Sequence, residues 1–460
     1  MCGIVGVCSE EGDAAGLAYA GVASLQHRGQ ESWGVAIAEG ASIANWSAVG
    51  LAHRPVDGLV GRPAQLAIGH TRYSTTGAPG AENAQPLVAR QGEHTVAIAH
   101  NGNVTNALEL RRELAAGGYV FRSTSDSEII LALLATAEGA VVEALPELVA
   151  RLEGAYSVVA LVDGALLAFR DPKGFRPLVL GSADGRTVAG SETCALDVLR
   201  CADQREIEPG ELVVAGPGAE PRSLRIGPPA RRRSCVFEPI YIARRDSLIG
   251  GERVEALRER LGERLGHEAP AEADVVVPVP ASGLPAARGY ARTSELPLVD
   301  ALVRNDYVGR TFIEPDPVLR SLSLRIKFNV VDGVEGLAVA VVDDSIVRGS
   351  TMRQVVELLR SAGAREVHVR IACPPLVSSC PYGVDIADTS ELLASGRTLD
   401  GVRSEIGATT LAYLSLDGLH AALGAADGHG LCQACLTSRY PTPVPQRLDK
   451  LHLAVASGDA

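Results

Sequence analysis

The sequence has few aromatic residues: Phe, Trp and Tyr together make up 4% of its 460 residues, and only two are tryptophan. Because aromatic side chains ordinarily supply much of the buried area of a core, this core must be built mainly from Ala, Val and Leu. The hydrophobic content is 46%, which is typical of a globular protein, and the length is sufficient for two or three domains.

Long apolar runs and an excess of basic residues are also lacking. No segment approaches the roughly 18 uninterrupted apolar residues of a membrane-spanning helix, and the N-terminus has no basic segment followed by an apolar one. We therefore expect a cytoplasmic protein that does not bind membranes. The formal net charge of −12 argues against nucleic acid as the principal partner, because binding to phosphates needs a basic surface.

Two regions of different character follow one another along the chain. Residues 1–226 alternate short β-prone runs, such as 96–99 and 157–162, with helical stretches such as 127–137, which predicts a layered α+β domain. The Pro-, Gly- and Arg-rich segment 227–233 is the best linker candidate.

The second region predicts a parallel sheet. Its apolar runs at 273–277, 337–342 and 367–372 are separated by helical stretches such as 352–362. In such sheets, ligands bind at the carboxyl ends of the strands.

A phosphate-binding motif follows the second of these strands. In Asp343-Asp344-Ser345-Ile346-Val347-Arg348-Gly349-Ser350-Thr351, small residues allow backbone N–H groups to converge on an anion at the start of a helix. The paired Asp343 and Asp344 would repel phosphate, so they are better suited to sugar hydroxyls or to magnesium carried by a polyphosphate. This pattern resembles the phosphoribosyl pyrophosphate (PRPP) signature of type I phosphoribosyltransferases. Cations at 303–313 and 325–327 and the loop 278–283 would add further contacts.

Cys2 is the candidate nucleophile. Removal of Met1 would make it the first residue, with an α-amino group whose pKa of about 7.7 to 8.0 suits a base for its own thiol. The alternative is a small buried hydrophobe that opens a strand, since residues 4–7 are apolar.

Six blocks of the first region favour the catalytic interpretation, and with the phosphate motif they resemble the glutamine PRPP amidotransferase (amidophosphoribosyltransferase) family over nearly the whole chain. The blocks are Met1-Cys2-Gly3-Ile4-Val5-Gly6, Leu25-Gln26-His27-Arg28-Gly29-Gln30-Glu31-Ser32, Gly69-His70-Thr71-Arg72-Tyr73-Ser74-Thr75, His100-Asn101-Gly102-Asn103, Ser125-Asp126-Ser127-Glu128 and Ser191-Glu192-Thr193-Cys194-Ala195.

The resemblance implies a fold for each region. Residues 1–228 would form an α+β N-terminal nucleophile (Ntn) hydrolase domain with four αββα layers, that is, a class II glutamine amidotransferase domain. Residues 229–460 would form an α/β type I phosphoribosyltransferase domain with a mainly parallel sheet and a C-terminal cysteine-bearing tail.

The resemblance also implies site residues. Cys2 would attack the glutamine amide, with Asn101 and the Gly102 N–H forming the oxyanion hole. Glutamine would be bound by four residues: Arg72 on its carboxylate, Asp126 on its ammonium, and His70 and Arg28. PRPP and magnesium would be bound by Asp343, Asp344, Ser282, Ser345, Arg348, Gly349, Ser350, Thr351, Arg304 and Lys327.

The implied reaction has two steps. Glutamine is hydrolysed to glutamate, and the ammonia passes through an internal channel to C1 of PRPP, where it displaces pyrophosphate and gives 5-phosphoribosylamine for purine synthesis. Magnesium would offset charge on the leaving group. Feedback inhibition by purine nucleotides and a homotetramer follow from the resemblance alone.

Four cysteines form a candidate metal site. Cys432 and Cys435 are a Cys-x-x-Cys pair, and Cys235 and Cys380 lie upstream. Four thiolates suit either a cubane cluster or tetrahedral zinc, and spacing alone does not decide between them. Their positions match the ligands of the iron–sulfur-containing bacterial branch, so the resemblance implies a structural [4Fe–4S] cluster, with zinc or free thiols as alternatives.

Five positions depart from the usual family pattern. Ala281 stands in place of an acid, Arg304 of a lysine, Arg245 of a proline, Pro317 of a glutamine and Trp33 of a small residue. Two alternatives therefore stay open: a paralogue from specialised metabolism with intact glutaminase chemistry and another acceptor, or a non-catalytic regulatory homologue that binds PRPP or nucleotides.

Overall fold

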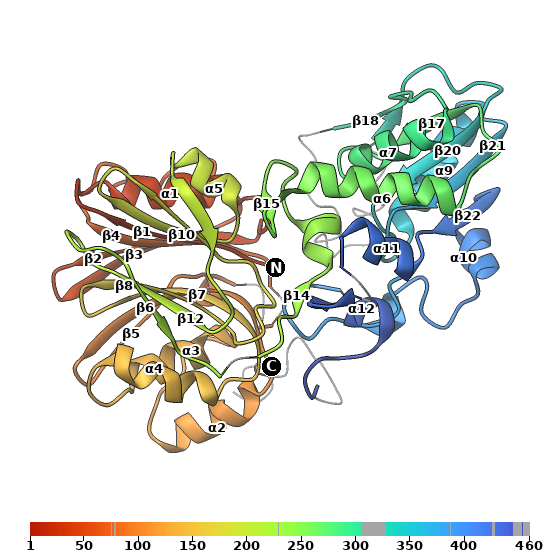
Figure 1. The fold of residues 1–460 in the computed structure, drawn as a ribbon. Coiled ribbons are helices and arrows are strands. Elements are labelled where there is room, and N and C mark those ends of the chain that lie inside the picture. Colours follow the sequence, from red (N-terminus) through yellow and green to blue (C-terminus); the bar gives the residue numbers. More distant parts are fainter. Residues whose placement is uncertain are drawn as a thin grey trace.

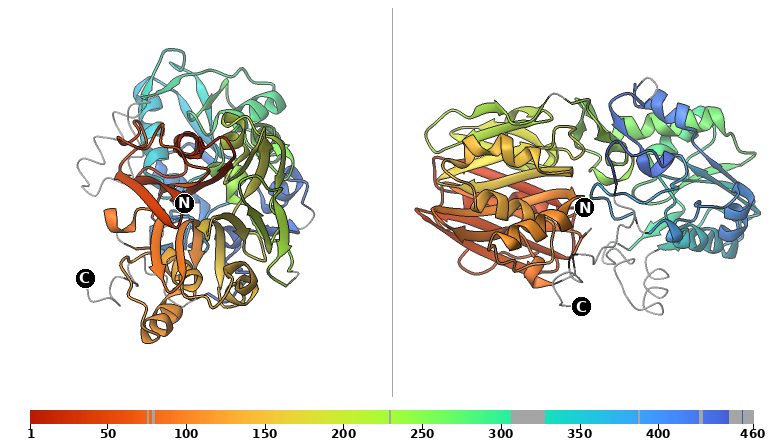
Figure 2. Two further views of the ribbon diagram at one scale, coloured as in Figure 1. Left: turned by 90° about the vertical axis from the view of Figure 1, so that its left-hand side faces the viewer. Right: turned by 90° about the horizontal axis from the view of Figure 1, so that it is seen from below.

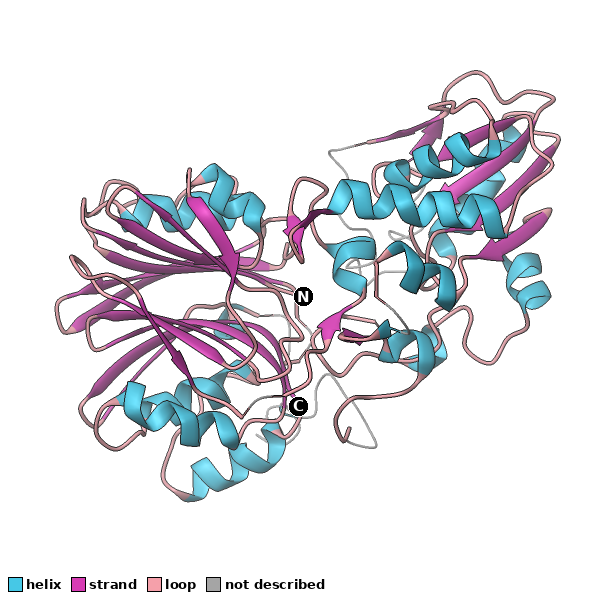
Figure 3. Ribbon diagram, in the orientation of Figure 1, coloured by secondary structure: helices cyan, strands magenta, loops and turns pink. Residues whose placement is uncertain are grey.

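Two stacked antiparallel sheets with helices outside them form the N-terminal lobe of this computed structural model (Figures 1 and 3). The structure describes residues 1–74, 76–77, 80–228, 230–305, 328–386, 388–425, 428–444 and 453. The first sheet has the order β11 (Ala202–Glu206), β9 (Val179–Ala183), β10 (Arg186–Gly190), β1 (Gly3–Ser9), β4 (Leu66–Arg72), β2 (Ser32–Glu39), β3 (Ser42–Val49). The second has the order β13 (Arg222–Arg225), β12 (Glu211–Ala215), β8 (Ala165–Arg170), β7 (Gly154–Val162), β6 (His94–Val104), β5 (Leu87–Gln91).

Helices cover the outer face of each sheet. The first sheet packs against α1 (Ala14–Ser24) and α5 (Thr193–Val198), and the second against α2 (Ala107–Ala116), α3 (Ser127–Ala135) and α4 (Val141–Ala150). The alternation of side chains along β1 explains this layering: Ile4 and Cys8 face the core between the sheets, whereas Val5 and Val7 face α1. The predicted αββα arrangement is confirmed.

The C-terminal lobe is built on a parallel sheet with the order β17 (Val275–Pro278), β20 (Ala338–Asp343), β21 (Glu366–Ile371), β22 (Thr410–Tyr413). Its helices are α6 (Val254–Glu268), α7 (Leu284–Ser294), α9 (Ser350–Ser361), α10 (Leu399–Ile406) and α11 (Leu416–Ala422). Helix α7 packs on the sheet and α6 on α7, closely enough that a Cβ at Gly262 would collide with the Ala286 carbonyl. A short antiparallel pair, β18 (Leu302–Arg304) and β19 (Phe328–Val330), lies beside the sheet.

Small elements join the lobes. Strand β14 (Ser234–Cys235) pairs in parallel with β23 (Leu431–Cys432), and they are followed in the chain by the π-helix η2 (Glu238–Ile242) and by α12 (Ala434–Thr437), respectively. The remaining pair is β15 (Leu248–Ile249) with β16 (Glu252–Arg253). Across the junction, the rings of Phe175 and Tyr382 stack with their centroids 4.3 Å apart. The N-terminus lies at this junction in Figure 1 and in the right-hand view of Figure 2.

The predicted elements lie where the apolar patterns place them, and the predicted parallel sheet is present. The proposed domain boundary at 228/229 falls between β13 and β14. One residue of the tail departs from the predicted division: Leu453 is fully buried in the core between the second sheet and α2–α4, in the first lobe. None of the described helices is both long and apolar enough to cross a lipid bilayer.

Candidate functional sites at the junction of the lobes

Cys2 lies immediately before β1, at the end of the sandwich that faces the second lobe, and is buried. Its backbone N–H donates to Asn101 Oδ1 at 3.3 Å, and its Sγ lies 3.6 Å from the carbonyl oxygen of Tyr73. Its own carbonyl oxygen accepts from Arg28 Nε at 2.9 Å. Cys2 is therefore held by contacts from β6, from the residue after β4 and from the loop after α1.

The predicted oxyanion-hole residues lie beside this thiol on β6. Asn101 is fully buried, and its Nδ2 has no hydrogen-bond partner among the described residues, so this donor is available to a ligand. Gly102 has a φ of +158°, and a Cβ there would collide with the carbonyl oxygen of Ala155. The close packing of β6 on β7 thus requires glycine at position 102.

Two charged residues predicted to bind the ends of glutamine lie at element termini. Arg72 ends β4, where Nη1 is 3.5 Å from Glu31 Oε2 and Nη2 donates to the Thr76 carbonyl at 3.3 Å. Asp126 immediately precedes α3 and accepts from the Val104 N–H at 3.0 Å. Both are buried and held in place by the protein before any ligand is bound.

Two buried histidines join the sheets. His70 is fully buried, and one of its ring nitrogens, Nε2, lies 3.2 Å from the carbonyl oxygen of His100. Burial lowers the pKa of His70 to about 3, with a further contribution from Arg72, and burial also lowers the pKa of His100. The described contacts of His70 are thus with protein groups between the sheets.

Arg28 is also predicted to bind glutamine, but the described contacts of its side chain are all with groups of the protein. Its side chain is 0% exposed, and besides the Cys2 carbonyl it contacts Glu192 of the first lobe and Glu238 of the second. Although burial disfavours its charge, these two carboxylates raise its pKa. These contacts suit a residue that holds Cys2 better than one that binds substrate directly.

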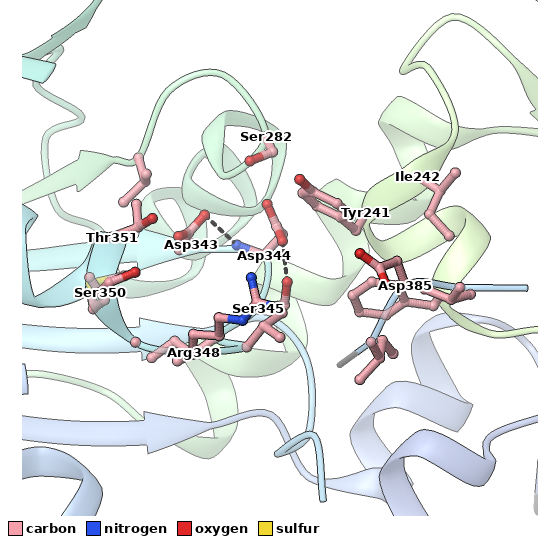
Figure 4. Close-up of a pocket in the computed structure, with 18 of the residues that line it drawn as sticks. Tyr241, Ile242, Ser282, Asp343, Asp344, Ser345, Arg348, Ser350, Thr351 and Asp385 are labelled. Carbon is pink, nitrogen blue, oxygen red and sulfur yellow. Dashed lines mark hydrogen bonds between the residues drawn. The ribbon is translucent and has the colours of Figure 1, made fainter. Parts of the chain in front are cut away.

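The predicted PRPP residues line a cavity of about 250 Å³ in the second lobe (Figure 4). It lies at the carboxyl ends of β17 and β20, as expected for a parallel sheet. The predicted residues in its wall are Ser282, Arg304, Asp343, Asp344, Ser345, Arg348, Gly349, Ser350 and Thr351. Lys327 lies outside the described residues.

The motif adopts the expected strand, loop and helix. Gly349 has a φ of +80°, in the region that favours glycine, and α9 begins at the next residue. The first residues of α9, Ser350 and Thr351, therefore direct hydroxyls and backbone N–H groups into the cavity wall.

Most polar groups of the motif are preorganised. The Asp344 N–H donates to Asp343 Oδ1 at 2.8 Å, and Ser345 Oγ donates to Asp344 Oδ1 at 2.5 Å. Burial raises the pKa of Asp344, opposed by hydrogen bonds from Ser282 and Ser345. Arg348 pairs with Glu391 at 2.7 Å, and Arg304 Nε is buried with no partner among the residues described.

The same cavity reaches the first site. Met1 and Tyr73 line it, and the hydroxyl of Tyr73 donates to Asp385 Oδ2 of the second lobe at 3.0 Å. Met1 adjoins Cys2 in the chain, and its α-amino group donates to the Tyr73 carbonyl at 3.2 Å. The cavity of the second site thus extends to residues that adjoin Cys2.

Of the five departures from the family pattern, the structure places one in this cavity wall. Arg304 lines it, whereas Ala281 is exposed between two lining residues. Arg245 is directed to Glu255 at 3.5 Å, away from the lining. Trp33 packs edge-to-face on Tyr19 in the core under α1, so the expectation that it bears on the acceptor site is wrong. Pro317 lies outside the described residues.

The four candidate metal-binding cysteines gather where the lobes meet. Cys235 and Cys432 are register partners in the β14–β23 pair, and Cys435 follows in α12. The Cys380 Sγ accepts from the Tyr382 N–H at 3.4 Å. Burial raises the pKa of Cys435, and the neighbouring thiols, among them Cys380, Cys235 and Cys432, raise it further.

In the part of the chain that the structure describes, no three or more His, Cys, Asp and Glu side chains are already arranged to hold a metal ion. All nine cysteines are free thiols, and Cys8, Cys194, Cys201 and Cys373 are buried.

Sequence reasoning missed Glu238 and gave no role to Glu192. Glu192 stands in one of the six blocks, and Glu238 interrupts an apolar run from Val236 to Ile242. A charged residue inside an apolar run needs a buried partner, and this was the available signal. The partners, Arg28 and Arg176, lie too far away in the sequence for spacing to identify them.

Comparisons with known proteins agree with these two sites. A family model described as a glutamine amidotransferase domain matches residues 70–198, and one described as a phosphoribosyl transferase domain matches residues 249–381. The chain is 44% identical over 456 residues to the amidophosphoribosyltransferase of Archaeoglobus fulgidus, covering 97% of this chain and 99% of the relative. It is 42% identical over 470 residues to that of Methanocaldococcus jannaschii, covering 96% and 98%.

A solved structure is similar over the same extent. The glutamine PRPP amidotransferase from B. subtilis, complexed with ADP and GMP, has a TM-score of 0.90 and 40% identity, covering 98% of this chain and 100% of that one. The likeness therefore includes both lobes and their relative placement.

Proposed function

The chain belongs to the amidophosphoribosyltransferase family, and from this premise we infer how its two sites work in sequence. It hydrolyses glutamine at the first site and transfers the ammonia to C1 of PRPP at the second, giving 5-phosphoribosylamine, glutamate and pyrophosphate for purine synthesis. The observation that carries this inference is the cavity that extends from the Asp343–Thr351 motif to Met1 and Tyr73, beside Cys2.

At the first site, the Cys2 thiol loses its proton to its own α-amino group and attacks the amide carbon of glutamine. Asn101 Nδ2 and the Gly102 N–H donate to the oxyanion that forms, and the unpartnered amide of Asn101 suits this task. The C–N bond breaks, ammonia leaves, and water hydrolyses the thioester to glutamate. Arg72 and Asp126 hold the carboxylate and ammonium of the substrate.

Maturation must remove Met1, because only then is the α-amino group on Cys2. With Met1 present this group belongs to Met1, and the nitrogen of Cys2 is a peptide N–H bonded to Asn101. A peptide nitrogen is not basic and does not accept the thiol proton.

At the second site, ammonia attacks C1 of PRPP as the bond to the pyrophosphate oxygen breaks. Asp343 and Asp344 bind ribose hydroxyls, and the loop to Thr351 binds the 5-phosphate through N–H and hydroxyl groups. Arg304, Ser282 and Lys327 are assigned to the pyrophosphate end.

Magnesium suits the oxygen-rich side of this cavity. Carboxylate and hydroxyl oxygens are the ligands it prefers, and Asp343, Asp344 and Ser345 supply them in the cavity wall. When bound with PRPP, it would reduce negative charge on the leaving pyrophosphate.

The cysteine quartet suits a [4Fe–4S] cluster, with tetrahedral zinc as the alternative. Four buried or half-buried thiols with no carboxylate among them form a soft donor set, and an N–H donor already faces one sulfur, at Cys380. Binding would require the side chains of Cys235, Cys380, Cys432 and Cys435 to turn to a common centre. Its role would be structural, joining the first strand of the second lobe to the tail. Iron and acid-labile sulfide in anaerobically purified protein test this assignment, and stoichiometric zinc without sulfide would contradict it.

Purine nucleotides are proposed as feedback inhibitors, because the similar B. subtilis structure was solved with ADP and GMP. A cytoplasmic homotetramer is proposed from the family alone. Light scattering tests the assembly, and a monomer at micromolar concentration would contradict it.

The two alternatives to this function have lost support. The altered-acceptor hypothesis depended on departures near the PRPP pocket, of which Trp33 and Arg245 lie elsewhere. A non-catalytic role is contradicted by membership of an enzyme family over the full chain.

The decisive experiment measures glutamate and pyrophosphate released from glutamine, magnesium and PRPP. We expect coupled release of both, and we expect Cys2→Ala to abolish release with glutamine while retaining pyrophosphate release with ammonia. Cys8→Ala, a buried cysteine between the sheets, is the matched control and should keep both activities. Glutamate release without any pyrophosphate would contradict PRPP as the acceptor.

A further inference from the structure

We propose that Glu238 of the second lobe is a positioning residue for glutamine hydrolysis in the first: it holds Arg28, and Arg28 holds the main chain of the nucleophile Cys2. The inference rests on the proposed hydrolysis at Cys2 and adds a residue to that site from the other lobe. Three observations support it.

The first observation is the geometry of the contact. Arg28 Nη2 donates to Glu238 Oε1 at 2.8 Å, and Nη1 donates to Glu238 Oε2 at 3.0 Å. This is a bidentate pair, which fixes the plane of the guanidinium as well as its position. The remaining donor, Nε, points to the Cys2 carbonyl at 2.9 Å, so the orientation that Glu238 imposes is passed directly to Cys2.

The second observation is burial. The side chains of Arg28, Glu238 and Glu192 are 0%, 3% and 2% exposed. Arg28 also donates to Glu192 at 2.5 Å, and Arg176 donates to Glu238 at 3.2 Å. Two cations thus face two carboxylates with no solvent to replace either partner. If Glu238 lost its charge, the guanidinium groups of Arg28 and Arg176 would have only the Glu192 carboxylate to balance them. The side chain of Arg28 would then rotate away from its present orientation.

The third observation is where Glu238 lies in the second lobe. It is the first residue of η2, and Tyr241 and Ile242 of the same short element line the PRPP cavity. The other carboxylate is also tied to the second lobe, because Glu192 accepts from Ser247 Oγ at 2.7 Å and from the Arg244 N–H at 2.9 Å. The support of Cys2 is therefore complete only when the lobes are docked.

The test separates a positioning role from a merely structural ion pair. Glu238→Gln keeps the shape and one acceptor but removes the charge. We expect kcat for glutamine hydrolysis to fall about 10- to 100-fold with KM for glutamine within about twofold, because misplacing a nucleophile affects reaction more than binding. Ammonia-dependent pyrophosphate release should keep its wild-type rate, which also shows that the variant is folded.

A second variant isolates the bond to Cys2. Arg28→Lys keeps a buried cation for both carboxylates, but an ammonium cannot reproduce the bidentate fork together with the bond to the Cys2 carbonyl. We expect the same loss of kcat, and no further loss in the double variant with Glu238→Gln, since the two residues act as one unit. A structural ion pair would tolerate lysine.

Glu206→Gln is the matched control. This carboxylate also lies at the lobe boundary, where it pairs with Arg232 and accepts from the Gly250 N–H, but it does not touch Arg28. The Glu206→Gln variant should hydrolyse glutamine at the wild-type rate.

Three outcomes would overturn the proposal, and the first two are wild-type kcat in Glu238→Gln and wild-type kcat in Arg28→Lys. An equal loss of ammonia-dependent activity in Glu238→Gln would also overturn it, because the defect would then not be specific to Cys2. If the wild-type protein released no glutamate at all, the proposed function itself would fail, which is a different result.

Discussion

At the scale of single residues, the first site depends on side chains whose usual charge the fold has changed or neutralised. His70 sits between the two sheets with no access to water, and burial together with Arg72 disfavours its charged form, although the contact of its Nε2 with the His100 carbonyl favours that form. Although burial opposes its charge, Glu192 keeps a pKa well below its usual range, because His27 and Arg28 lie beside it. Neutral and charged groups are thus both specified by their neighbours.

His70 predicts a pH dependence of stability. The pKa of His70 is about 3 in the folded protein and 6.5 in an unfolded chain. Below pH 6.5 the unfolded chain therefore binds a proton at this residue, whereas the folded protein does not. The free energy of unfolding is therefore not reduced by His70 above pH 6.5. It decreases as the pH falls from 6.5 towards 3, by up to about 1.4 kcal/mol for each pH unit. When the pH is lowered from 7.5 to 5.5, we expect the thermal midpoint of His70→Gln to fall less than that of the wild type.

The comparison needs a histidine substitution that leaves the buried site intact. His53→Gln, at an exposed position, serves as this control and should keep the wild-type pH response. Equal responses in His70→Gln and wild type would contradict the assignment.

At the scale of elements, the second site is made by the passage from β20 through its loop into α9. The left-handed conformation of Gly349 turns the chain so that α9 starts with its hydroxyl residues in the cavity wall. A Cβ at this position would lie 2.5 Å from Leu393 Cδ2. Glycine is required here by both backbone and packing.

Gly349→Ala should therefore weaken PRPP binding. The left-handed conformation costs an alanine about 1 to 2 kcal/mol, and the contact with Leu393 adds to it, so the loop shifts. We expect KM for PRPP in the ammonia-dependent assay to rise at least about fivefold, in line with 1 kcal/mol of binding energy. Gly396→Ala, with a φ of +66° and open space around its Cβ, is the control. The same KM in both variants would refute this.

Elements were predictable from sequence where the information is local. The apolar runs of β17, β20 and β21 and the motif at Asp343 can each be recognised within about a dozen residues of sequence. The structure contains these elements at the predicted positions. The six blocks likewise brought Cys2, Asn101 and Arg72 into one candidate site. Local pattern could not show that Arg28 would be enclosed by Glu192 and Glu238, because those contacts join parts of the chain far apart.

Trp33 shows the opposite error. Its departure from the family pattern was one reason to keep another acceptor open, but strand alternation directs its ring outward to the layer under α1. Position along the chain was a poor guide to direction across a strand.

At the scale of the whole molecule, the lobes are joined at both ends of the second one. The chain leaves the first lobe after β13, and Leu453 is again buried in the first lobe's core. Between these points, the stacked rings of Phe175 and Tyr382 and the ion pairs of Arg28 bind the lobes side to side.

Leu453→Ala should destabilise the first lobe although its position is in the C-terminal tail. Replacing a fully buried leucine with alanine costs about 2 to 5 kcal/mol. We expect the thermal midpoint to fall by several degrees, measured by calorimetry. Leu399→Ala, with a side chain 52% exposed, is the matched control and should change it little. Equal midpoints in the two variants would show that Leu453 does not support the core.

Met1 bears on both steps of the proposed reaction. Met1 lines the cavity through which we propose that ammonia passes, and its thioether accepts from Arg176 at 2.8 Å. In a chain that keeps Met1, the peptide bond to Cys2 removes the base and the same residue occupies part of the cavity wall. One cut by an aminopeptidase would therefore start the chemistry and clear the route together, so that no ammonia is produced before it has somewhere to go.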